Sequence, residues 1–97
     1  MHEHSLAREL WPQLKQIAEA KGLARVTRVE MVVGMLHGVS GEFLEHSFQH
    51  AFQGTSFEGA EMAITVVEPG QTMSVGGENT TANGWELLIT RIEGEQN

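Results

Sequence analysis

Cysteine is absent from this chain of 97 residues. Without a thiol the protein has no disulfide, no thiolate zinc site, no iron–sulfur ligation and no cysteine nucleophile. Tyrosine and aspartate are also absent, so all thirteen acidic residues are glutamates. No stretch of the sequence approaches the roughly 20 apolar residues that span a bilayer, which argues against a membrane protein.

Positive charge is scarce. Six Lys and Arg residues stand against thirteen Glu, which gives a formal net charge of −7. A chain this acidic is not attracted to phosphate backbones or anionic lipid surfaces, so we expect no nucleic-acid partner and no membrane association. The start Met1-His2-Glu3-His4-Ser5 lacks the basic and apolar regions of a signal peptide, and we therefore expect a cytoplasmic protein.

Hydrophobic periodicity predicts one α+β domain that covers residues 1–97. Two segments have helical periodicity and three have the composition of strands: 5–21 and 40–53, then 25–34, 60–67 and 85–93. We expect both helices on one face of a three-stranded, mostly antiparallel sheet, in the order helix-strand-helix-strand-loop-strand. Residues 69–84, which lack a core signal, are predicted to be a flexible loop.

The lengths of these elements gather several metal-ligating residues at one end of the domain. The first helix and first strand are each about 25–30 Å long, so the strand should end near where the helix begins. This groups the amino terminus with three His and two Glu: His2, Glu3, His4, His37 and Glu42. Imidazoles suit a divalent transition metal. The alternative is that these are ordinary solvated residues near a terminus.

Met1-His2 allows a specific kind of chelate. The amine of residue 1, the deprotonated amide nitrogen of His2 and the His2 imidazole can close two rings in one plane, which leaves a fourth position open. Square-planar nitrogen coordination favours Ni(II) or Cu(II) over zinc.

Other motifs do not point to catalysis. His46 and His50 are spaced i, i+4, but the residues between them do not form HExxH, and we interpret the pair as part of a solvated helix face. The Gly-rich segments 34–38 and 75–78 lack the Lys-Ser/Thr of a phosphate-binding loop, and no GxSxG nucleophile motif is present. We therefore expect that the protein is not an enzyme.

Several short motifs follow one another in a recognisable order: Met1-His2-Glu3, Lys21-Gly22, Arg25-Val26-Thr27-Arg28-Val29, Glu58-Gly59-Ala60-Glu61 and Glu86-Leu87-Leu88-Ile89. Together they resemble the HypA/HybF family of nickel metallochaperones, which act in the maturation of nickel–iron hydrogenases. The resemblance implies the fold above and transient Ni(II) binding at Met1, His2 and Glu3. It also implies delivery of nickel to an accessory GTPase or to the hydrogenase large subunit.

The chain departs from the family in one large respect. Family members carry a zinc domain with two CxxC pairs between the second and third strands, where this chain has only Pro69–Gly84. We therefore expect no structural zinc. Some relatives also use a His near the last strand as a nickel ligand, and His4 and His37 are the candidates to replace it here. The alternative function is a metal-independent adapter or interaction module derived from the same family.

Overall fold

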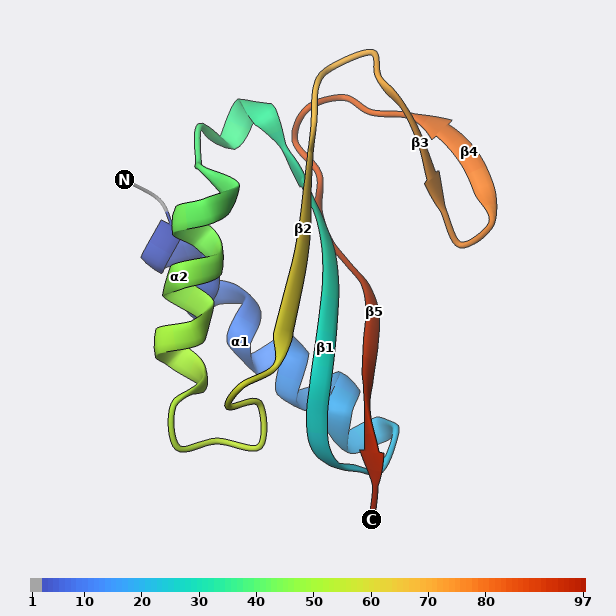
Figure 1. Cartoon of the computed structure of the whole chain (residues 1–97). Helices are drawn as coiled ribbons and strands as arrows, with labels where there is room; N and C mark the ends of the chain where they lie inside the picture. The colour runs from blue at the N-terminus through green and yellow to red at the C-terminus, as the bar shows by residue number, and fades with distance from the viewer. Residues whose placement is uncertain (1–2) are drawn as a thin grey trace.

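The computed structural model describes residues 3–97, with the side chains of residues 4–97. Its elements are α1 (Glu3–Ala20), β1 (Leu23–Gly34), the 3-10 helix η1 (Met35–His37), α2 (Gly41–Phe52), β2 (Glu61–Val67), β3 (Thr72–Val75), β4 (Glu78–Thr81) and β5 (Leu87–Gln96). Helices α1 and α2 lie on one side of the sheet that β2, β1 and β5 form, and β3 and β4 project away from the helices (Figure 1). The predicted α+β fold is confirmed.

Helix α1 forms because Leu6, Leu10 and Leu14 recur on one face and are buried. It ends before Gly22, which takes a left-handed backbone conformation with φ of +69°. The helix begins at Glu3, earlier than the predicted start at residue 5. His4 therefore lies in the first turn of a helix and not in a terminal tail. Among the described residues, no helix has the length and apolar character needed to cross a membrane.

Strand β1 is the centre of the sheet. It runs parallel to β2 and antiparallel to β5, so the sheet is mixed and not mostly antiparallel as expected. The parallel pair arises because α2 carries the chain back to the end of the sheet where β1 began, which is the usual crossover between parallel strands. Val29, Met31 and Val33 point from β1 into the core beneath the two helices.

Helix α2 begins after Ser40, whose Oγ accepts a hydrogen bond from the Phe43 N–H at 3.4 Å. The helix buries Leu44, Phe48 and Phe52 completely. Phe52 also lies against the indole of Trp11, with ring centroids 5.6 Å apart, so the aromatic side chains join α2 to α1.

Residues 69–84, predicted to be a loop, contain the two-stranded antiparallel hairpin β3–β4. Val75 pairs with Glu78 across a two-residue turn, in which Gly76 and Gly77 have φ of +62° and +83°. Both residues of a type I′ turn need positive φ, which Gly adopts without steric cost. The base of the hairpin is closed by a hydrogen bond of 2.8 Å from the Gly70 N–H to the Ala82 carbonyl oxygen.

Candidate metal centre

Of the residues predicted to bind nickel, the structure describes the Glu3 backbone and the side chains of His4 and His37. Met1 and His2 are outside the described residues, as is the side chain of Glu3, whose backbone begins the helix. His4 follows in the first turn and is exposed. The metal site predicted on Met1, His2 and Glu3 stays a prediction.

His4 lies in a groove between the two helices. The groove has a volume of about 380 Å³ and is lined from α1 by His4, Ala7, Arg8 and Trp11 and from α2 by Ser47, His50 and Ala51. His4 therefore lies across from His50, a residue that the sequence pattern assigned to a solvated helix face. His37 does not line this groove.

His37 occupies a different position, at the end of η1 beside the start of β5. Its Nε2 lies 3.1 Å from the Trp85 carbonyl oxygen, so this nitrogen carries the proton and donates to the carbonyl. The imidazole also meets the Trp85 indole edge-on, with ring centroids 5.5 Å apart and an interplanar angle of 89°. The contact holds the ring against the turn that leads into β5.

Of the predicted group of His2, Glu3, His4, His37 and Glu42, the described side chains include His4, His37 and Glu42. Within residues 4–97, no three His or Glu side chains come close enough together to hold a metal ion. Strand β1 has 12 residues and spans about 40 Å, whereas the 18 residues of α1 span about 27 Å. The strand runs beyond the start of the helix and carries His37 with it.

Glu86, which the sequence pattern did not single out, organises the turn beside His37. Its carboxylate accepts hydrogen bonds from the backbone N–H groups of Asn83, at 2.7 Å, and Gly84, at 3.0 Å. Desolvation raises the pKa of the Glu86 carboxyl, but these backbone donors and the nearby His37 outweigh it, and the net pKa is lowered. Glu86 is therefore a structural anion that fixes the connection between the hairpin and β5.

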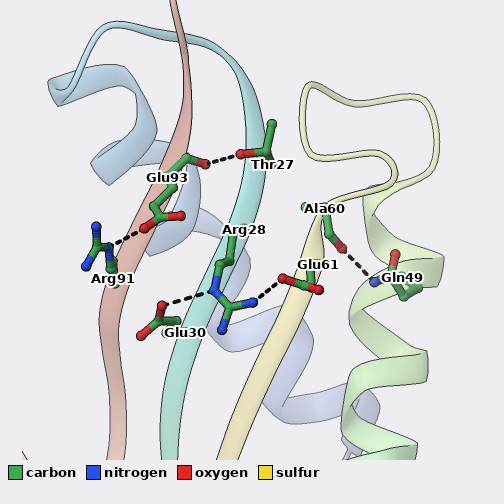
Figure 2. Close-up of polar contacts among 8 residues, drawn as sticks. All are labelled: Thr27, Arg28, Glu30, Gln49, Ala60, Glu61, Arg91 and Glu93. Carbon is green, nitrogen blue, oxygen red and sulfur yellow. Dashed lines mark hydrogen bonds and ion pairs between the residues drawn. The ribbon is translucent and has the colours of Figure 1, made fainter.

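The face of the sheet opposite the helices carries ion pairs. The Arg28 guanidinium lies between the carboxylates of Glu30 and Glu61, with a distance of 3.0 Å from its Nε to Glu30 Oε2, and Arg91 pairs with Glu93 in the same way at 2.5 Å (Figure 2). On this face Arg28 contacts two carboxylates and Arg91 contacts one. These carboxylates are therefore engaged by arginine side chains.

The fold and these positions define a small α+β domain of two helices on a mixed sheet, with His residues at the start of its first helix and at the end of its central strand. A family model described as "Hydrogenase/urease nickel incorporation, metallochaperone, hypA" matches residues 1–73. The chain belongs to the HypA family.

Individual relatives agree with this assignment. The chain is 41% identical over 64 residues to the hydrogenase maturation factor HypA of Chlorobium limicola, a match that covers 66% of this chain and 55% of the relative. With the protein of the same name from Prosthecochloris aestuarii it shares 34% identity over 85 residues, which covers 88% of this chain and 75% of that one. The matches thus span little more than half the length of several curated relatives.

A solved structure supports the fold independently. The solution structure of the Ni metallochaperone HypA from Helicobacter pylori matches with a TM-score of 0.69, at 12% sequence identity and over 100% of both chains. An identity this low supports the shared fold alone.

Proposed function

We propose that this protein is a nickel-binding accessory protein that delivers Ni(II) during the maturation of a nickel–iron hydrogenase or another nickel enzyme. The single observation that carries the proposal is the sequence Met1-His2-Glu3 in a chain of the HypA family. The description of that family names nickel incorporation for both hydrogenase and urease. Exposure of His4, which follows this segment in the first turn of α1, also supports the proposal.

The chemistry of the segment suits a carrier. In protein prepared with Met1 as its free amino terminus, the Met1 amine, the His2 amide nitrogen and the His2 imidazole provide three nitrogen ligands in one plane, an arrangement that favours Ni(II). The fourth position stays open to a ligand from the protein that receives the metal. His4 and His37 are weaker candidates for the fourth ligand, because His4 lies in the groove between the helices and His37 is hydrogen-bonded to the Trp85 carbonyl oxygen.

In this proposal the protein acts through partners and not as an enzyme. It would hand Ni(II) to an accessory GTPase or to the hydrogenase large subunit, in the cytoplasm. No resident zinc is needed, because the sequence has no Cys and the buried core already joins both helices to the sheet.

Calorimetric titration with Ni(II) tests the proposal. The protein with a free Met1 amine should bind one Ni(II), and His2→Ala should abolish binding without changing the circular dichroism spectrum. An amino-terminal tag, which removes the free amine, should abolish binding as well. The matched control is the double variant His46→Ala/His50→Ala, which should bind as the parent does. Unchanged binding by the His2 variant would overturn the proposed site.

A second candidate function, a metal-independent adapter, is favoured by apolar side chains at the end of the sheet. Met35 and Leu36 are each 46% exposed and Trp85 is 58% exposed, and the Leu36 N–H bonds the Gly84 carbonyl oxygen at 2.9 Å, which holds this surface together. Binding to a partner that survives both His2→Ala and a chelator would favour the adapter over the nickel carrier.

A further inference from the structure

The groove between α1 and α2 concentrates hydrogen-bond donors. His4 and Arg8 are one helical turn apart on α1, and His50 faces them from α2. Arg8 carries five N–H donors and a permanent positive charge, and an imidazole has at least one N–H donor in either protonation state. Three side chains that carry N–H donors therefore line one groove from two helices.

The positive charge in this groove is unusual for the molecule. The chain has a net charge of −7 and only six Lys and Arg residues. Of the arginines, Arg28 and Arg91 are already neutralised by Glu partners on the open face of the sheet. Arg8 takes part in none of the ion pairs found among residues 4–97.

Ser47 adds a hydroxyl to the wall of the groove. It is 5% exposed and lines the groove, and it is the one polar residue in the buried set of the described chain. Within the described chain no buried side-chain oxygen lacks a hydrogen-bond partner, so the Ser47 hydroxyl does not require a ligand. A hydroxyl can donate as well as accept, so it can still donate to an acceptor bound in the groove.

The chemistry of the ligand follows from these neighbours. A metal ion is disfavoured, because the Arg8 guanidinium in the same groove repels a cation and cannot act as a ligand. An oxyanion suits the donors, and Arg binds a carboxylate in a bidentate geometry that Lys does not provide. Ala7, Ala51 and the Trp11 ring add apolar walls, which suit methylene groups better than bulk water.

We propose that the groove between α1 and α2 is a docking site for the carboxylate side chain of a partner protein. Arg8 and the two His residues bind the carboxylate oxygens, Ser47 donates to the same group, and the apolar walls contact the residues that flank it. The volume of about 380 Å³ is sufficient for one side chain and its neighbours but small for a larger ligand. The site does not require nickel, so it goes beyond the proposed metal function, and it places a partner next to the residues that precede His4.

Nuclear magnetic resonance titration of the full chain tests the proposal. The probes are the peptide acetyl-Leu-Glu-Leu-amide and its matched acetyl-Leu-Gln-Leu-amide, added without nickel at low salt. The Glu peptide should shift the backbone amide signals of Arg8, Ser47 and His50 and reach saturation. The Gln peptide should bind about tenfold more weakly or not at all, because it lacks the charge that Arg8 binds.

Two substitutions that each remove one positive charge make the test specific. Arg8→Gln should weaken binding of the Glu peptide by about tenfold, whereas Arg25→Gln, which removes a charge from an exposed position on β1, should leave binding unchanged. Both residues are exposed, so both variants should keep the parental spectrum outside the substituted site.

Three results would overturn the proposal. The first is equal affinity for the Glu and Gln peptides. The second is an Arg8 variant that binds as the parent does. The third is sodium acetate that binds as tightly as the Glu peptide, which would assign the groove to small free carboxylates and not to a partner's side chain. Each of these results is independent of Ni(II) binding at Met1-His2-Glu3, so this proposal and the metal proposal can fail separately.

Discussion

The imidazole of His37 is held edge-on against the indole of Trp85, and its Nε2 donates to the Trp85 carbonyl oxygen at 3.1 Å. The two residues are 48 positions apart in the sequence, so the contact connects the end of β1 to the start of β5. Because Nε2 carries the proton, the lone pair that a neutral His37 offers to a metal is on Nδ1. His37 is therefore a fixed monodentate group and not a flexible arm.

This position predicts a small role for His37 in nickel binding. His37→Ala should reduce Ni(II) affinity much less than His2→Ala does, because His37 is in no three-ligand group within residues 4–97. Calorimetric titration of the two variants side by side measures the difference. A loss of binding in the His37 variant as complete as that in the His2 variant would contradict this prediction.

Glu86→Gln should destabilise the protein at neutral pH. The pKa of the Glu86 carboxyl is lowered in the fold, so its contribution to stability is complete above the unfolded-state pKa of about 4.3 and is lost as the pH falls through the lower folded-state value. The thermal midpoint of the variant should therefore be below that of the parent at pH 7, and the difference should shrink below about pH 4.3. Thermal denaturation across this range measures it.

The matched control for Glu86 is Glu78→Gln, an exposed carboxylate on β4. The control should change the midpoint little at any pH. If the difference in thermal midpoint between the parent and the Glu86 variant grew as the pH fell, the hydrogen bonds to Asn83 and Gly84 would not be the cause of the destabilisation.

Gly34→Ala should be strongly destabilising. A Cβ at this position would lie 2.1 Å from the carbonyl carbon and oxygen of Gly84 and 2.5 Å from the Trp85 nitrogen, so backbone would have to move. Overpacking of this kind costs about 1–3 kcal/mol. In Gly41→Ala the new Cβ meets Val66 at an ordinary 3.5 Å, and that variant should stay within about 0.5 kcal/mol of the parent. Urea denaturation compares the two, and equal stability of both variants would contradict the close approach.

Residues 69–84 should be the first part of the chain that a protease cuts. The hairpin has only two strands, and all four residues of β4 are exposed. An isolated two-stranded hairpin is marginally stable, so it should open more often than the three-stranded sheet. Brief digestion with subtilisin followed by mass spectrometry locates the first cuts. First cuts within α2 or β1 would be inconsistent with this order of stability.

Chelation should leave the stability of the protein unchanged. The chain has no Cys to bind structural zinc, and its core is formed by apolar side chains from both helices and the sheet. The thermal midpoint of the purified protein should be the same with EDTA and with calcium-saturated EDTA. A drop of several degrees with free EDTA alone would reveal a resident metal that supports the fold.

Periodicity in the sequence was sufficient to predict the helices and the three main strands. Leu6, Leu10 and Leu14 recur at the helical period, and the β-branched residues of β1 favour a strand, so local pattern and core packing agree. The hairpin was missed because its strands have four residues each and its turn is Gly76-Gly77, which has the composition of a loop. Gly-Gly between two short alternating runs was the available signal.

The surroundings of the His residues depend on information that periodicity does not contain. The angle at which α1 and α2 cross determines which residues of α2 face His4. That angle follows from the packing of the side chains between the two helices. The contact of Glu86 with Asn83 and Gly84 is local in the chain, but hydrophobic periodicity carries no signal for it. The nearby sequence Asn83-Gly84 indicates a turn but does not identify the carboxylate that caps it.

The base of the β3–β4 hairpin makes the domain suitable for grafting. Gly70 and Ala82, where the chain enters and leaves the hairpin, are joined by a hydrogen bond and form its stem. An inserted segment whose two ends meet at this stem therefore does not strain the sheet. The exposed Gly76-Gly77 tip can therefore be replaced by a longer module, such as a fluorescent reporter or a metal-binding domain, at a cost that rises only slowly with its length. A segment of variable size can evolve at this stem while the packing between the helices and the sheet stays the same.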